Sequence, residues 1–90
     1  MEVKYKMKHH VFEAVDVIAC FSILNLRILR FKKENTIYRV SRIVREWRSK
    51  EGNTLFSHFT LECRQQNIIC ELALNHSTLK WEFIQYENIY

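Results

Sequence analysis

A two-residue repeat of apolar side chains in the second half of the sequence is the feature that most restricts the fold. Apolar residues occupy every second position through 59–63, 68–74 and 79–83. This period places alternate side chains on opposite faces of an extended strand, whereas an amphipathic helix repeats every 3.6 residues. Short polar stretches rich in turn-forming residues separate the segments. The sequence therefore predicts three consecutive antiparallel strands over residues 59–83.

The register of this meander is predicted by matching apolar residues across neighbouring strands. A two-residue loop at 66–67 and a four-residue loop at 75–78 keep apolar side chains on one face. A slip of one residue would place leucine opposite glutamate, which a half-buried sheet disfavours. The predicted pairs are Cys63 with Cys70, Leu61 with Leu72, and Leu72 with Trp81.

The first half of the chain carries further strand patterns and one ambiguous segment. Strands are predicted at residues 2–7, 13–21, 26–31 and 36–40. In the segment 40–48 the apolar residues have the i, i+3, i+4, i+7 spacing of a helix. Ser41 would cap such a helix and Gly52 would follow its end. A strand instead needs a β-bulge near Arg42, and periodicity leaves both interpretations open.

Turns in this chain must rely on asparagine. The 90 residues, which we treat as one domain spanning 1–90, include one glycine and no proline. Asn35, Asn53, Asn67 and Asn75 each lie between apolar runs, and asparagine accepts the left-handed backbone better than most residues.

Several runs together resemble a family of small bacterial β-rich domains of unknown function. The runs are V-D-V-I-A-C-F (15–21), I-Y-R-V-S-R-I-V-R-E-W-R (37–48), C-E-L-A-L (70–74) and W-E-F-I (81–84). They match the pattern V-x-V-I-A-x-F, Y-x-V-x-x-I-x-x-x-W, E-L, W-x-F across residues 13–87. Lys33 and Asn35 stand where that family usually has tryptophan and glycine. The resemblance implies a β-rich fold, favours a long bulged strand over 37–48, and carries no catalytic motif.

We therefore predict an all-β fold, an antiparallel meander of six or seven strands curled into a small barrel or half-barrel. The alternative is an α+β fold with a helix at about 41–50. The predicted core consists of Val15, Val17, Phe21, Tyr38, Val40, Ile43, Trp47, Phe59, Leu61, Cys63, Cys70, Leu72, Leu74, Trp81 and Phe83.

Composition bounds the environment of the chain. The longest apolar run, 17–21, is far shorter than the ~20 residues that span a bilayer, and 1–8 has no signal-peptide pattern. We expect a cytoplasmic protein whose three cysteines are reduced. No metal-ligand spacing is present, so we expect neither a metal nor a cofactor.

Basic charge is concentrated in residues 27–50, which hold nine basic and two acidic residues. The candidate binding residues, for nucleic acid or for an acidic protein, are Arg30, Lys32, Lys33, Arg39, Arg42, Arg45 and Arg48. Interleaved Tyr38 and Trp47 would stack on bases if they were exposed. A basic strand edge that blocks edge-to-edge pairing is the alternative. A bulged strand would scatter these residues over both faces, whereas a helix would align them.

Catalytic chemistry has one candidate in the sequence. The predicted register aligns Glu62, Glu71 and Glu82 on the outer face, where paired carboxylates can act as acid and base. With one glycine there is no phosphate-binding loop, and no small-molecule substrate is evident. The sequence thus favours a non-enzymatic module that binds nucleic acid or an acidic protein. The alternatives are a structural or oligomerising protein that pairs through strand edges such as 2–7, and an enzyme that uses the glutamate row.

Overall fold

The computed structural model describes residues 7–23 and 25–89, and these residues form strands and turns without a helix. The strands are β1 (His9–Phe21), β2 (Leu26–Lys33), β3 (Thr36–Arg39), β4 (Arg42–Glu51), β5 (Thr54–Cys63), β6 (Ile68–Asn75) and β7 (Trp81–Asn88). The all-β prediction is confirmed, and the alternative with a helix at 41–50 is wrong. Nothing in the described ranges forms a helix long and apolar enough to cross a membrane.

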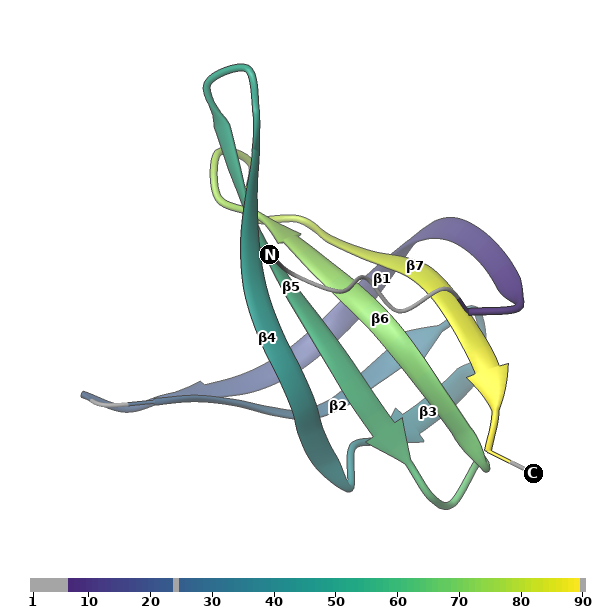
Figure 1. The fold of residues 1–90 in the computed structure, drawn as a ribbon. Coiled ribbons are helices and arrows are strands. Elements are labelled where there is room, and N and C mark those ends of the chain that lie inside the picture. Colours follow the sequence, from purple (N-terminus) through teal and green to yellow (C-terminus); the bar gives the residue numbers. More distant parts are fainter. Residues whose placement is uncertain (1–6, 24, 90) are drawn as a thin grey trace.

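All seven strands of the described chain belong to one antiparallel sheet, in the order β3-β2-β1-β7-β6-β5-β4. Because β3 and β4 follow each other in sequence but form opposite edges, the sheet has to curl back on itself. Figure 1 shows β1, β2 and β3 lying behind the layer formed by β4 to β7. The chain crosses between the two sides of the curled sheet at residues 40–41, where the Val40 amide donates to the Leu29 carbonyl of β2 at 3.0 Å and the Ser41 amide donates to the Glu62 carbonyl of β5 at 2.7 Å. No ladder joins β3 to β4 among the described residues, so of the two predicted forms, barrel and half-barrel, the sheet is the half-barrel.

A β-bulge at Val44 explains the helix-like spacing of the segment 40–48. Ile43 pairs with Leu61 and Arg45 pairs with Thr60, so one extra residue lies between these pairs. The bulge shifts the alternation, and Trp47 lies opposite His58 on the convex face. The predicted bulge exists, two residues beyond Arg42. Trp47 is buried, with 9% of its surface exposed, but on the face opposite the main core in which it was predicted.

The main core lies between the two layers of the half-barrel. Seven predicted members are buried there: Val15, Phe59, Leu61, Cys63, Cys70, Leu72 and Phe83. Five more pack against them and are partly buried: Val17, Tyr38, Val40, Ile43 and Trp81. Leu74 is half-buried. The core also contains Ile28, Phe31 and Ile68, which the sequence analysis missed.

Phe21 was predicted in the core and is 72% exposed. It is the last residue of β1, where the β1–β2 hairpin extends beyond the rest of the sheet (Figure 1). The alternation of β1 therefore continues to its last residue without burial there.

The predicted register of the meander is wrong by two residues. The turn after β5 spans four residues, 64–67, and Asn67 adopts the left-handed conformation with φ of 59°. The Asn67 amide closes this turn on the Arg64 carbonyl at 3.1 Å. The observed pairs are Cys63 with Ile68, Leu61 with Cys70, Leu72 with Phe83, and Leu74 with Trp81. A shift of two preserves which face each residue occupies, so apolar residues still meet apolar ones.

The strands of the first half of the chain have different bounds from those that the sequence predicted. β1 begins at His9 rather than at residue 13, and β2 continues to Lys33. The predicted strand 2–7 lies outside the described residues except for Met7, which is buried at 5% exposure. The turn after β2 uses Glu34 at φ 56° as its left-handed residue, where the sequence suggested Asn35.

Candidate functional site

A basic surface lies on the convex face of β1, β2 and β3, and we call it the basic face. Val17 and Phe31 pair on the concave side, so their sequence neighbours point outward. Arg30 lies between Ile18 on β1 and Arg39 on β3. Lys32 lies between Asp16 and Ile37 in the same way. With Arg27 the basic face holds four cations and one carboxylate in a small grid.

The side chains of the basic face are open to solvent. Arg27, Arg30, Lys32 and Arg39 are all exposed, and within the described ranges none of them lies within 4.0 Å of a carboxylate. Arg30 and Arg39 are directly opposite each other, an arrangement of like charges that destabilises a sheet. Ile18 and Ile37, at 47% and 50% exposure, add apolar surface to the grid.

The structure assigns three of the seven predicted binding residues, Arg30, Lys32 and Arg39, to the basic face. Lys33 points to the concave side, where its Nζ lies 3.6 Å from carboxylate oxygens of both Glu13 and Glu34. Burial lowers the pKa of Lys33, but these carboxylates outweigh it and raise that pKa above 10.5. Lys33 therefore forms a local ion-pair cluster at the rim of the core and is not part of the basic face.

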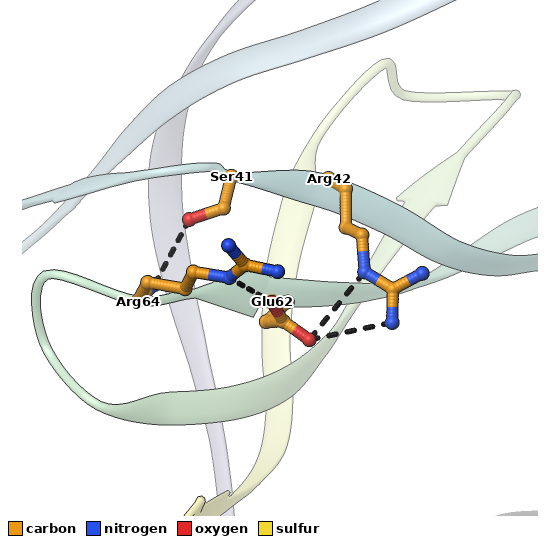
Figure 2. A network of polar contacts seen from close by, with 4 residues as sticks. All are labelled: Ser41, Arg42, Glu62 and Arg64. Carbon is orange, nitrogen blue, oxygen red and sulfur yellow. Dashed lines mark hydrogen bonds and ion pairs between the residues drawn. The ribbon is translucent and has the colours of Figure 1, made fainter.

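The three arginines of β4 are divided between the two faces of the sheet. Arg42 contacts Glu62 at 3.5 Å, and Glu62 also accepts a 2.6 Å hydrogen bond from Arg64 Nε, as Figure 2 shows. The hydrogen bond from Arg64 and the charge of Arg42 lower the pKa of Glu62 below 4.5. Arg45 lies over the ring of Trp47 at 5.2 Å on the same convex face. Arg48 pairs with Ser57 on the concave face. The expected scattering by a bulged strand is thus observed.

The aromatic residues interleaved with the basic segment face away from the basic face. Tyr38 stacks on Phe31 inside the half-barrel, with ring centroids 4.9 Å apart and planes 5° apart. Trp47 is buried against His58, at 5.1 Å and 7°. The basic face therefore carries aliphatic rather than aromatic surface between its cations.

The glutamate row predicted on the outer face does not form, because the register differs. Glu62 lies opposite Ile69, Glu71 opposite Thr60 and Gln85, and Glu82 opposite Ala73. Like charges are thereby separated, which removes the electrostatic penalty that the predicted register carried.

Glu71 instead belongs to a chain of hydrogen bonds that crosses the convex face, which we call the polar relay. Ser49 Oγ lies 2.7 Å from His58 Nε2, and His58 Nδ1 lies 2.9 Å from Glu71 Oε2. Gln85 Nε2 donates to Glu71 Oε1 at 2.8 Å, and Gln85 Oε1 accepts from the Met7 amide at 3.1 Å. The relay runs diagonally over four adjacent strands, β4, β5, β6 and β7.

A pocket of about 520 Å³ lies over the polar relay. Its walls include Ser49, His58 and Glu71, together with apolar side chains of Phe12, Phe56 and Ile84. Sequence analysis missed this site. The β4–β5 turn at 52–53 pairs Ser49 with Phe56 and Trp47 with His58, so Ser49 and His58 lie side by side on one face. This short hairpin could have indicated the Ser49–His58 contact from sequence. The position of Glu71 near His58 depends on the β5–β6 register, and the predicted register was wrong by two residues.

In the part of the chain that the structure describes, no three His, Cys, Asp or Glu side chains gather as a metal site would require. Cys20, Cys63 and Cys70 are free thiols, and only Cys20 is exposed. Comparisons with known protein families, with curated proteins and with solved structures find no match to this chain. The family resemblance of the sequence therefore stays a prediction, and function has to be argued from the surface and the site.

Proposed function

We propose that this chain is a binding module that recognises an acidic protein surface through the basic face. The observation that carries the proposal is the grid on β1–β3, in which exposed isoleucines alternate with cations that have no carboxylate within 4.0 Å among the described residues. Arginine is enriched at protein–protein interfaces, and the fully buried centre of such an interface is more apolar than the rest of the protein surface. An acidic surface would also neutralise the Arg30–Arg39 repulsion, so binding would relieve a cost that the free protein bears.

The spacing of the cations fits an extended acidic segment. Arg30 and Lys32 are two residues apart on β2, about 6.6–6.8 Å along the strand. Carboxylates at every second residue of an extended chain have the same spacing. Neighbouring strands offer a second row about 4.8 Å away, which includes Arg39 and Ile37.

Nucleic acid is the less favoured partner on three grounds. The aromatic side chains that would stack on bases, Tyr38 and Trp47, pack inside the protein or against His58. The basic residues of 27–50 are divided over two faces, so they form no continuous track for a phosphate backbone. Exposed Ile18 and Ile37 suit a protein surface better than a row of phosphates.

Fluorescence anisotropy can test the proposal with a labelled peptide that mixes glutamate and isoleucine. We expect binding that weakens with salt, as steering by opposite charges does. A matched peptide with glutamine in place of glutamate should bind at least ~10-fold more weakly. The double variant Arg30→Glu/Arg39→Glu should abolish binding, whereas Arg48→Glu, on the concave face, should preserve it.

Single-stranded and duplex DNA serve as competing probes at two salt concentrations. Tighter binding to DNA than to the acidic peptide, with a salt slope of about −0.7 to −0.9 per phosphate, would replace the proposal with a nucleic-acid function. Absence of binding to the peptide at low salt, or equal binding by the double variant, would refute the acidic-partner proposal.

A further inference from the structure

The geometry points to Ser49 as an activated nucleophile that accepts acyl groups from esters, with His58 as its general base. Ser49, His58 and Glu71 are linked by hydrogen bonds of 2.7 and 2.9 Å, in the order hydroxyl, imidazole, carboxylate. A hydroxyl becomes a nucleophile when an adjacent base, itself oriented by a third group, can take its proton. The inference concerns the convex face over β4–β7 and is independent of the basic face on β1–β3.

The proton positions in the polar relay follow from the Met7–Gln85 hydrogen bond at one end of it. The Met7 amide can only donate, so it donates to Gln85 Oε1, and the amide nitrogen of Gln85 donates to Glu71. The ionised carboxylate of Glu71 can only accept, so His58 Nδ1 carries a proton and donates it. In the neutral ring Nε2 then presents its lone pair to Ser49. This is the tautomer that a general base for Ser49 requires.

Packing holds the base in this orientation. Trp47 stacks flat on the His58 ring, 5.1 Å away with planes 7° apart. The side chains of His58 and Glu71 are 17% and 9% exposed, so little water competes for the bonds between them. Ser49 is half-buried and lines the pocket. Glu71 and Gln85 therefore act as positioning residues, and Ser49 and His58 face the space a substrate would occupy.

The pocket above Ser49 indicates the class of substrate. Its volume of about 520 Å³ lies in the range of small-molecule sites, and Phe12, Phe56, Ala73 and Ile84 give it apolar walls. Phe12 holds a left-handed backbone, with φ of 55°, at an irregularity in the β1–β7 pairing between His10 and Glu13. Backbone strain of this kind is concentrated at functional sites. The apolar part of this lining suits an ester with a short apolar acyl chain, and Lys50, Glu51 and Glu82 make the rest of the wall charged.

The reaction proceeds in two balanced steps. Ser49 Oγ attacks the ester carbonyl carbon while its proton passes to His58 Nε2, and the alcohol leaves with that proton as the carbon–oxygen bond breaks. Water then attacks the acyl-serine and gives its proton to His58. The serine oxygen leaves with this proton, the carboxylic acid is released, and the free enzyme is restored.

A second serine–histidine pair in the same protein provides an internal control. Ser57 Oγ lies 2.7 Å from His76 Nε2, the same distance as in the relay. Within the described residues no carboxylate hydrogen-bonds to His76, and its ring lacks the stacking that Trp47 gives His58. If a short serine–histidine contact alone sufficed for reactivity, both serines would react.

The test is covalent labelling with an alkyl fluorophosphonate, with the modified residue identified by mass spectrometry, together with release of nitrophenol from 4-nitrophenyl butyrate. We expect label on Ser49 in the folded protein, none on Ser57, and complete loss in Ser49→Ala. Ser57→Ala should label as the parent does. His58→Gln should slow labelling by about 100-fold or more, the range of general-base contributions.

Glu71→Gln separates a positioning role from a merely structural one, since circular dichroism and the melting temperature report the fold while the labelling rate reports the base. A slower rate at an unchanged melting temperature supports the inference. If the variant unfolds, Ser49→Ala and Ser57→Ala, which each remove one hydroxyl, still decide the matter. Labelling no faster than that of free serine, or label that persists in Ser49→Ala, would overturn it.

Discussion

Replacing Phe31 by alanine should destabilise the protein more than most single substitutions. Its side chain is 1% exposed and lies between Tyr38, at 4.9 Å, and Phe83, at 5.6 Å. Through these rings β2 and β3 are attached to β7 in the opposite layer. Removal of a buried phenyl ring costs about 3–5 kcal/mol through lost burial and the cavity that remains. A domain of this length has roughly 5–13 kcal/mol of stability in all, so about a quarter or more of it should disappear.

Urea unfolding followed by tryptophan fluorescence measures this loss, and the melting temperature should fall by about 4–8 °C for each kcal/mol. Phe21→Ala is the matched control, because Phe21 is 72% exposed and should change stability by no more than about 0.5 kcal/mol. Phe31→Leu retains most of the apolar volume and should cost roughly 1–2 kcal/mol. Equal effects of Phe21→Ala and Phe31→Ala would show that the two layers do not pack as described.

Three further predictions concern charge and thiol chemistry. Arg39→Gln should stabilise the protein by about 0.2–1 kcal/mol at low salt, because it relieves the repulsion from Arg30, and urea unfolding that shows a loss instead would contradict this. Glu62→Gln should lower stability at neutral pH. The folded pKa of Glu62 is depressed, so its contribution is present above the unfolded value and lost as pH falls through the folded pKa; a difference that persists in acid would argue against the Arg64 contact. Native protein should react with iodoacetamide at exposed Cys20 but not at Cys70, whose pKa is raised well above 9.0 by its hydrogen bond with Cys63 and by burial; peptide mapping distinguishes the two.

Prediction from sequence failed where one segment had to be placed against another that is distant in the chain. Phe31 was missed because β2 reads as apolar on both sides, and only its pairing with β1 shows that Leu29 is exposed and Phe31 buried. Trp47 was assigned to the core because the bulge was predicted near Arg42 and not at Val44. Ile43 faces the core opposite Leu61, and because the extra residue at Val44 comes after it, Trp47 lies on the opposite face.

The candidate sites depended on the same information. Arg30, Lys32 and Arg39 were predicted as binding residues from charge alone, and the structure places them on one face because β2 and β3 form a simple hairpin. Lys33 was predicted with them, but alternation along β2 turns it toward Glu13. The β4–β5 hairpin could have indicated the Ser49–His58 part of the polar relay, but Glu71 and Gln85 join it through the pairing of β6 and β7.

Local chemistry in the sequence determined that this chain forms strands, that their apolar sides share one face, and that residues 27–50 are basic. Alternation is a property of neighbouring residues, and a two-residue error in register leaves every side chain on its correct face. Tertiary structure alone decided which residues became neighbours across strands, because that depends on turn length and on bulges. The left-handed Asn67 lengthens one turn, separates Glu62 from Glu71, and brings Glu71 to His58 instead. The register of β6 and β7 also differs from the prediction, and it places Gln85 instead of Glu82 opposite Glu71. The two changes of register together replace a row of repelling carboxylates with a hydrogen-bonded relay.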